Sequence, residues 1–251
     1  MKRKTYILAA LAAIVLAMTV ILSVELWRFK SAQNAQAVTI ATQTTESLTT
    51  ALGERLAGVE SKARAMGETF GEREYSQLEI EDILRQASLD NPEIRGVTAC
   101  FEPFAFNPET KLFCPYYNKS TSEFVYVEDS YDYTIPGSGT AWYTGIIDDG
   151  AKWVEPYYGA AAQDWYIDYG VPFYWTQGPR KGQVRGIIDF TLSAKDFKTF
   201  VHSLSVGKTN QEFLVTQNGN FVSHPIAEYL GTKTLNDLIA EDPNPSLQQA
   251  Y

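Results

Sequence analysis

The longest uncharged stretch of the chain lies near its N-terminus. Residues 5–24 contain no charged side chain, and the basic triplet 2–4 precedes them. About 20 apolar residues span the hydrocarbon core of a bilayer as a helix, and basic residues beside such a helix stay in the cytoplasm. We therefore predict a cytoplasmic N-terminus at 1–4 and a transmembrane helix at 5–27. A cleaved signal peptide is the alternative, although its apolar region is usually only about 7–15 residues long.

Helical spacing continues beyond this stretch. From residue 48 onward, apolar side chains recur at steps of three or four, as on the face of a helix that packs against a partner. These residues are Leu48, Leu52, Leu56, Val59, Ala63, Met66 and Phe70. The pattern predicts one long helix over Ser31–Phe70, within a stalk of 28–72 that links an outer domain to the membrane. Two partners stay open for this face: the helix's own domain, or a second copy in a homodimer.

The remainder of the chain alternates short apolar runs with turn residues, which is typical of an antiparallel sheet. A second helix is expected over Ser76–Ser88, and Asn91-Pro92 ends it. Strands are expected at 95–101, 111–117, 124–127, 152–157, 167–174, 184–190, 212–216 and 220–223, and helices at 142–148, 194–204 and 235–239. Asn218-Gly219 marks the last hairpin. This order predicts an α+β fold in which a PAS-like antiparallel sheet follows the long helix.

Charge and composition argue against several classes of function. The chain has 251 residues and a net charge of −9, from 21 basic and 30 acidic side chains, which argues against a nucleic-acid partner. Its two cysteines and two histidines lack the spacing of a metal site or a catalytic triad. We expect no metal, no cofactor and no enzymatic activity in this chain. A surface hydrolase that uses two clustered acids, such as Asp148 and Asp149, is the weaker alternative.

Aromatic residues are concentrated between residues 141 and 189. Acidic side chains lie among them: Asp148, Asp149, Glu155, Asp164, Asp168 and Asp189. Aromatic rings with a few carboxylates are what a pocket for a small cationic molecule needs. The alternative is that these rings form the core of a β-rich domain.

The two cysteines fall in the first two predicted strands of the sheet. Cys100 ends the strand at 95–101, and Cys114 lies in its partner at 111–117. The pair can face each other across this hairpin, and thiols outside the cytoplasm oxidise readily. A disulfide is the prediction, and two buried thiols are the alternative.

Several short motifs, in this order, resemble an extracytoplasmic double-Cache sensor domain of bacterial transmembrane signalling proteins. They are Phe101-Glu102-Pro103, Cys114-Pro115-Tyr116-Tyr117, Ala141-Trp142-Tyr143, Trp153-Val154-Glu155-Pro156-Tyr157, Val171-Pro172-Phe173, Gly186-Ile187-Ile188-Asp189 and the segment from Phe213-Leu214-Val215 to His224-Pro225. Each motif is weak alone, and the resemblance rests on the ordered set, which covers Ser31–Leu238.

The resemblance implies a small ligand in the membrane-distal lobe, such as an amino acid, an amine or a carboxylate. An amino-acid-binding subset carries an Arg two residues before the Trp-Tyr pair, which clamps the ligand carboxylate, and an Asp late in the sheet. Here the Asp matches Asp189, whereas Thr140 occupies the Arg position, so an amine without a carboxylate fits better. The candidate ligand-binding residues are Trp142, Tyr143, Trp153, Tyr157, Asp168, Asp189, Tyr131 and Tyr133.

The predicted organisation places the membrane-distal Cache lobe at 73–240 and the start of a truncated proximal region at 241–251. We expect a single-pass protein of the inner (plasma) membrane with a periplasmic or extracellular sensor domain. Ligand binding would pass a signal through the membrane helix to an output domain, such as a kinase, cyclase or phosphatase, absent from this chain. A membrane-anchored dimerisation or adhesion module without a small ligand is the alternative.

Overall fold

A computed structural model describes residues 2–137, 139–159, 164–203 and 213–242, and the side chains of these residues except 2–17 and 20. The chain divides into two compact units, Met1–Ala51 and Leu52–Tyr251. Among the described side chains, no helix offers an apolar stretch long enough to cross a bilayer. The predicted membrane segment 5–27 falls mostly on residues outside those described with side chains.

The first helix, α1, runs over Lys2–Glu72 and contains the predicted long helix. From Leu52 onward it belongs to the second unit, where Val59, Ala63 and Phe70 are fully buried against the sheet. This part of the predicted apolar face therefore packs on the helix's own domain. A buried arginine on strand β7 (Val184–Ser193) lies at the end of the helix. Arg185 donates hydrogen bonds from Nη1 to the carbonyls of Phe70 (3.0 Å) and Arg73 (2.8 Å). The last carbonyls of a helix have no partner within the helix, so Arg185 supplies one.

A short helix, α2 (Gln77–Leu89), follows and begins with a capping box. The Ser76 hydroxyl accepts from the backbone of Glu79, and the Glu79 carboxylate accepts from the backbone of Ser76, so both free amides at the helix start are bonded. Ile80 and Leu84 are buried. Because they are four residues apart, they lie on one face, which packs on the sheet.

Antiparallel pairing builds the main sheet in the order β3-β2-β1-β7-β6-β4, with β5 also paired to β6. The strands are β1 (Gly96–Phe101), β2 (Pro115–Asn118), β3 (Glu123–Tyr126), β4 (Lys152–Trp153), β5 (Tyr157–Gly159), β6 (Asp164–Tyr174) and β7 (Val184–Ser193). The other elements between β3 and the end of the sheet are η1 (Val127–Asp129) and α3 (Ala141–Asp149). The predicted α+β fold with a long first helix and an antiparallel sheet is confirmed.

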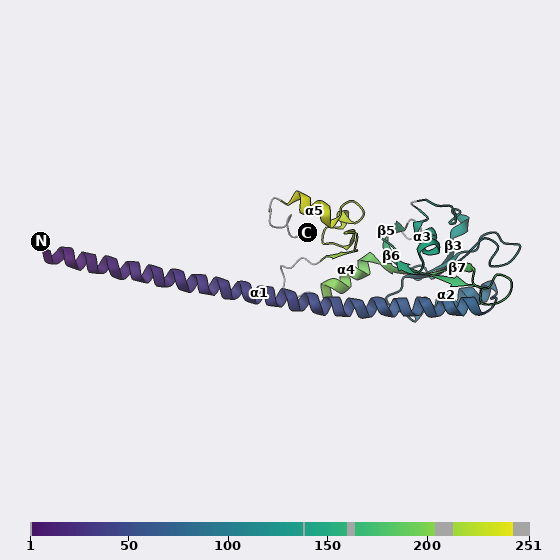
Figure 1. The fold of residues 1–251 in the computed structure, drawn as a ribbon, viewed down its shortest axis with the longest axis horizontal. Coiled ribbons are helices and arrows are strands. Elements are labelled where there is room, and N and C mark those ends of the chain that lie inside the picture. The colour runs from purple at the N-terminus through teal and green to yellow at the C-terminus, as the bar shows by residue number, and fades with distance from the viewer. Residues whose placement is uncertain (1, 138, 160–163, 204–212, 243–251) are drawn as a thin grey trace. The chain divides into compact units, whose positions relative to one another are not determined.

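Alternation along the central strands gives the sheet two different faces. Side chains at odd positions of β1 and β6 and at even positions of β7, such as Val97, Tyr169 and Phe190, join the apolar core with α1 and α2. The intervening positions face α3, which lies on the opposite side of the sheet (Figure 1). Gly170 faces α3, and a Cβ there would lie 1.7 Å from Ile146 Cδ1. The helix is thus seated against the sheet, and the space beside it remains open.

Cys100 at the end of β1 and Cys114 just before β2 are joined as a disulfide, with their Cα atoms 4.0 Å apart. Both are buried in a small apolar cluster that also contains Tyr133, Tyr143 and Ile146. The disulfide therefore lies under the segment that connects β3 to α3.

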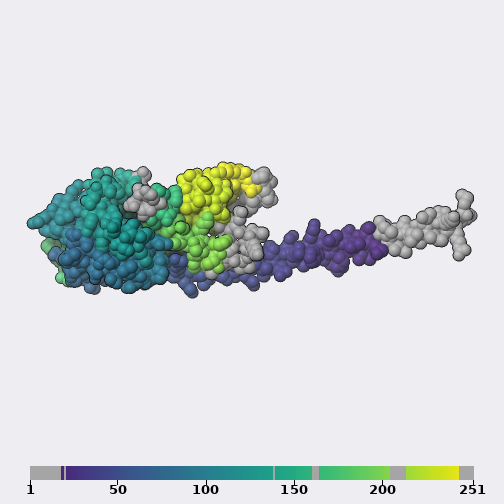
Figure 2. All heavy atoms as spheres, turned by 180° about the vertical axis from the view of Figure 1, so that it is seen from behind, coloured from purple at the N-terminus to yellow at the C-terminus, as the bar shows by residue number. Residues whose placement is uncertain are grey.

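The C-terminal part of the second unit begins after α4 (Ala194–Ser203). It contains the hairpin β8 (Leu214–Val215) and β9 (Phe221–Ser223), then η2 (Ala227–Tyr229) and α5 (Leu235–Glu241). The hairpin turns at Asn218-Gly219, as the sequence predicts, and Gly219 has a φ of +82° that suits glycine. In Figure 2 this yellow segment packs beside α4 (green) and the body of the unit.

Candidate functional site

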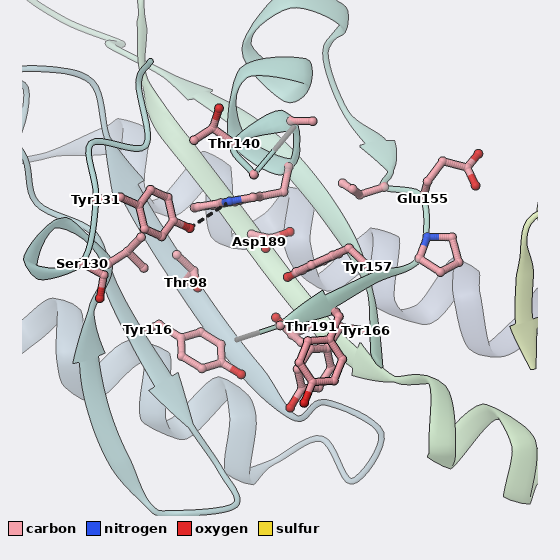
Figure 3. A pocket seen from close by; sticks show the side chains of 18 of the residues that line it. Thr98, Tyr116, Ser130, Tyr131, Thr140, Glu155, Tyr157, Tyr166, Asp189 and Thr191 are labelled. Atoms are coloured by element: carbon pink, nitrogen blue, oxygen red, sulfur yellow. Dashed lines mark hydrogen bonds between the residues drawn. The ribbon is translucent and has the colours of Figure 1, made fainter. Parts of the chain in front are cut away.

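A cavity of about 770 Å³ opens on the face of the sheet that carries α3. This volume lies within the range of small-molecule sites. The cavity is lined by Thr98, Tyr116, Val125, Val127, Ser130, Tyr131, Gly139, Thr140, Ala141, Trp142, Val154, Glu155, Pro156, Tyr157, Tyr158, Gly159, Tyr166, Asp189 and Thr191. These residues come from the sheet, from the β3–α3 connection and from the segment that leads into β5 (Figure 3).

The floor of the cavity carries two buried carboxylates on neighbouring strands. In the β6–β7 register Asp189 lies opposite Gly170, and Asp168 lies opposite Thr191. Asp168 and Asp189 are therefore diagonal neighbours on the same face, within reach of each other. Asp168 is fully buried, and Asp189 is 2% exposed. The Tyr157 hydroxyl donates a hydrogen bond to Asp168 Oδ2.

Burial determines the charge of this pair. Removal from water raises the pKa of Asp168 to about 6, although hydrogen bonds from Tyr157 and other neighbours oppose the rise. Burial and the adjacent Asp168 carboxylate raise the pKa of Asp189 well above its usual range. Two carboxylates so close together resist full ionisation, so the pair holds a proton more firmly than exposed acids do.

The pair lacks the partners that a buried carboxylate normally has. Apart from the hydrogen bond that the two acids share with each other, Oδ1 of Asp168 and Oδ1 of Asp189 are both buried without a partner. The described residues that line the cavity include no Lys, Arg or His. Buried carboxylates are usually paired with a positive group or a hydrogen-bond donor. The floor of this pocket is therefore complementary to a cation that donates hydrogen bonds.

Aromatic rings form the walls above the acids. Trp142, at the start of α3, donates from Nε1 to the hydroxyl of Tyr131 (3.2 Å), and this bond closes one side of the cavity (Figure 3). Tyr157 and Tyr166 line the opposite side, and Tyr116 lies below Tyr131 (Figure 3). Burial raises the pKa of Tyr166 to about 12 and shifts the pKa values of the other two phenols upward. The walls thus offer neutral rings and hydroxyls, which attract a cation through their π faces.

Thr140 is the residue that the sequence resemblance places where an arginine would clamp a ligand carboxylate. Its Oγ1 donates to the backbone carbonyl of Ile135 (2.6 Å) and lies 3.2 Å from that of Gly137. The hydroxyl is therefore used to hold the β3–α3 connection. It carries no charge, and the described lining offers no other cationic group.

Of the residues predicted from the sequence, Tyr131, Trp142, Tyr157 and Asp189 line the cavity. Asp168 lies directly behind the lining, where it bonds Tyr157. The structure thus brings five of the eight candidates together around one space. Their contact with a ligand remains a prediction.

Tyr133 and Tyr143, two further candidates from the sequence, are not among the residues that line the cavity. The Tyr133 hydroxyl donates to the carbonyl of Phe101 (2.7 Å), and the Tyr143 hydroxyl donates to the Glu102 carboxylate. Both rings pack in the cluster around the disulfide. Successive helix residues point about 100° apart, so Trp142 faces the cavity while Tyr143 faces the core.

Trp153, the remaining candidate, lies on the opposite side of the sheet from the cavity. It pairs with Tyr169 in the β4–β6 register, and both side chains point toward α1. The Trp153 ring lies 5.0 Å from that of Tyr169, and its Nε1 donates to Glu60 Oε1 of α1 (2.8 Å). The side chain therefore joins β4 to the long helix.

Sequence reasoning missed several lining residues, among them Tyr116, Tyr166, Thr98 and Thr191. The alternation of side chains along a strand could have identified two of them. Residues two apart on a strand share a face, so Asp189 points to Thr191 on β7 and Asp168 points to Tyr166 on β6. Thr98 and Tyr116 require the β1–β7 and β1–β2 registers, which the sequence leaves open.

Comparisons with known proteins agree with this fold. Residues 80–199 match the family model described as the methyl-accepting chemotaxis protein-like, first PDC sensor domain. The match spans α2, the main sheet, α3 and most of α4, and so contains the cavity. The recognition of a Cache, PDC-type sensor domain is thus confirmed. No curated protein sequence matches the chain significantly.

Solved structures of sensor domains share the architecture. A structure of methyl-accepting chemotaxis protein X aligns with a TM-score of 0.63 and 13% identity, over 83% of this chain and 81% of that one. The ligand-binding domain of the Pseudomonas aeruginosa chemoreceptor PctB with L-Gln aligns with a TM-score of 0.56 and 16% identity, over 79% of this chain and 72% of that one. The ligand-binding domain of the Campylobacter jejuni chemoreceptor Tlp3 with L-norvaline aligns with a TM-score of 0.54 and 16% identity, over 75% of this chain and 69% of that one. At these identities the likeness establishes the fold alone.

Proposed function

Since residues 80–199 carry a PDC-type sensor domain, we propose that this chain is the sensory part of a membrane receptor and binds a small amine that has no carboxylate. The observation that carries the proposal is the buried pair of Asp168 and Asp189, which bond each other and each keep one oxygen that no group outside the pair bonds. An ammonium group would supply both the charge and the hydrogen bonds that this pair lacks.

The ligand's position follows from the chemistry of the lining. Its ammonium group binds at the floor against Asp189, with Asp168 behind it. Its carbon skeleton packs between the rings of Trp142 and Tyr157, where apolar surface is removed from water. Because Trp142 belongs to α3 and Tyr157 to β5, a ligand between them would draw these two elements together.

The amino acids bound by PctB and Tlp3 support a sensory role for this fold and sharpen the ligand class. An α-amino acid brings a carboxylate as well as an ammonium group. A buried carboxylate without a cation or donor is costly, and Thr140 supplies neither a charge nor a free hydroxyl. Removing the carboxylate from the ligand removes this cost.

We propose that the signal leaves the pocket through β6 and α1. Asp168 faces the pocket, and the next residue, Tyr169, faces the helix. Arg64 of α1 donates to the Tyr169 hydroxyl (2.5 Å), and the Trp153–Glu60 bond lies beside it. A shift of β6 on ligand binding would therefore act on α1. A ligand changes this equilibrium only by its different affinity for the two states.

The proposed setting is the inner membrane, with 5–27 as a single span, the N-terminus in the cytoplasm and the sensor domain outside. The part of α1 that belongs to the first unit would then connect the sensor to the bilayer. A second copy of the chain could pair with the exposed apolar residues of this part, which include Val38 and Ile40. A dimerisation or adhesion module is the alternative. It predicts self-association without stabilisation by any small molecule.

A ligand screen tests the proposal. The full chain, purified in mild detergent, is heated with amines, amino acids, carboxylates and sugars. A ligand at 100 times its dissociation constant stabilises the folded state by about 2.7 kcal/mol. We expect shifts with amines in the wild type and in Asp148→Asn, an exposed matched control, and none in Asp189→Asn. If no compound stabilises the chain and the chain self-associates, the dimerisation or adhesion module is favoured.

A further inference from the structure

Two asparagines of the C-terminal hairpin hold a carboxylate on the rim of the pocket. Asn218 Nδ2 donates to Glu155 Oε1 (2.6 Å), and Asn220 Nδ2 donates to Glu155 Oε2 (3.0 Å). Each carboxylate oxygen thus has its own amide donor, and hydrogen bonds to an ionised acceptor are the stronger kind. The hairpin lies outside the segment that matches the sensor-domain family model, residues 80–199.

The hairpin is rigid enough to fix these two amides. Thr216 donates its backbone amide to the Asn220 carbonyl (2.9 Å), and Gly219 donates to the Thr216 carbonyl (2.9 Å). The Leu235 amide donates to the Gly219 carbonyl (2.8 Å), so the turn is also tied to the start of α5. Gly219 has positive φ and lies between the two asparagines. The spacing of their side chains is therefore set by the turn.

Glu155 belongs to the segment 154–159, every residue of which lines the cavity. In Figure 3 its carboxylate is turned away from Asp189, toward the outside of the pocket. Two residues further on, Tyr157 bonds Asp168 at the floor. The segment is thus held at one point by the hairpin and at another by the buried acid.

The sheet holds this wall on either side of Glu155, through the Val154 amide, which donates to the Asp168 carbonyl (2.8 Å), and through the pairing of β5 with β6. Both attachments are short. β4 and β5 contain two and three residues, and Pro156 between them has no amide to donate. A second contact with the C-terminal part lies nearby. The backbone of Gly231 lies against the Trp165 indole, such that a Cβ there would be 1.9 Å from Cη2. The Tyr158 ring also contacts this indole, edge to face, with 5.9 Å between the ring centroids.

We infer that the C-terminal hairpin completes the binding site: Asn218 and Asn220 act as positioning residues that hold the pocket wall 154–159 through Glu155. The effect on ligand affinity rests on the proposed function, whereas the effect on the wall does not. Because coupling between two sites is reciprocal, a ligand that draws in Tyr157 changes how firmly the hairpin is held. The hairpin is then a second exit for the signal, besides α1.

Hydrogen exchange of the full chain tests the inference without any ligand. In the double variant Asn218→Ala/Asn220→Ala, backbone amides of 152–159 should exchange about tenfold faster, since the wall opens locally once its hydrogen bonds are lost. Amides of β6 and β7 should keep their protection. Gln217→Ala, in the same turn and exposed, is the matched control and should leave 152–159 unchanged.

Variants of Glu155 separate positioning from general support of the fold. Glu155→Gln keeps an oxygen that accepts from one asparagine and should retain most of the protection, whereas Glu155→Ala should match the double asparagine variant. Unchanged exchange of 152–159 in both the double variant and Glu155→Ala overturns the inference. An amine screen that fails while these exchange results hold removes the proposed function and leaves the positioning role in place.

Discussion

Asp168 and Asp189 lie on the same face of β6 and β7, one register step apart, and each has a buried Oδ1 that no group outside the pair bonds. Ionising both acids costs stability, because two buried carboxylates repel each other and lose their water. The pocket is therefore prepared for a positive group, and its charge state depends on pH.

Replacing Asp189 by Asn separates binding from stability. The folded-state pKa values of both acids are raised above the usual value of about 3.9. Their contribution to stability is thus present below about pH 4 and is lost as pH rises through the folded pKa of Asp168, about 6. Asp189→Asn should bind no amine. Its free energy of unfolding at pH 7.5 should nevertheless be about 1–3 kcal/mol higher than that of the wild type. Denaturant unfolding measures this, and a large loss of stability would contradict it.

Amine affinity should depend on pH through the same pair. Protons compete with the ligand's ammonium group for the carboxylates, so the affinity should fall as pH is lowered through about 6, the pKa of Asp168. Well below that pH the decrease should approach about tenfold per unit. Calorimetric titrations between pH 5 and 8 measure the slope. An affinity that rises toward low pH would mean that the pair does not bind the cation in its ionised form.

Introducing an arginine at position 140 should change the ligand class. Thr140→Arg places a cation at the cavity margin, where the native hydroxyl bonds only the backbone of Ile135 and Gly137. Amines should bind about tenfold more weakly because of charge repulsion, and the corresponding amino acids should gain affinity through their carboxylates. Thr140→Gln, which is long but neutral, should gain no amino-acid binding. Equal effects of the two variants would point to crowding instead of charge.

The disulfide between Cys100 and Cys114 should stabilise the β3–α3 connection. It closes a loop with a sequence separation of 14, for which the loop entropy corresponds to about 3 kcal/mol. Cys100→Ala/Cys114→Ala should lose about this much stability, with greater exchange around Tyr133 and Tyr143. Alkylation of the unfolded, unreduced chain checks the bond directly. Two labelled thiols there would show that it does not form.

Sequence patterns predicted the framework because helix and strand periods repeat over many residues. The apolar face from Leu52 to Phe70, the Asn91-Pro92 stop of the second helix and the Asn218-Gly219 turn each act locally, and each leaves a local signature. The binding residues were predicted less well. Trp142 and Tyr143 are adjacent, as are Asp168 and Tyr169, yet only one member of each pair is directed toward the pocket. Only the helix phase and strand register, set by tertiary packing, decide which one reaches the pocket.

The contacts of the hairpin with Glu155 could not be predicted from the sequence at all. They join residues more than 60 positions apart, and each residue alone fits an ordinary surface loop. The same holds for Arg185, whose pairing with the last carbonyls of α1 depends on where the helix crosses the sheet.

Calorimetric titration with amines and the amino acids from which they differ by one carboxylate tests the central claim most directly. Suitable pairs are cadaverine with lysine, tyramine with tyrosine, and isoamylamine with leucine, each measured on the full wild-type chain and on Asp189→Asn. We predict that at least one amine binds and that its amino-acid counterpart binds at least about tenfold more weakly, which corresponds to about 1.4 kcal/mol. We also predict that Asp189→Asn abolishes the binding. An amino acid that binds as tightly as its amine, or an amine that binds Asp189→Asn unchanged, would contradict this account of the pocket.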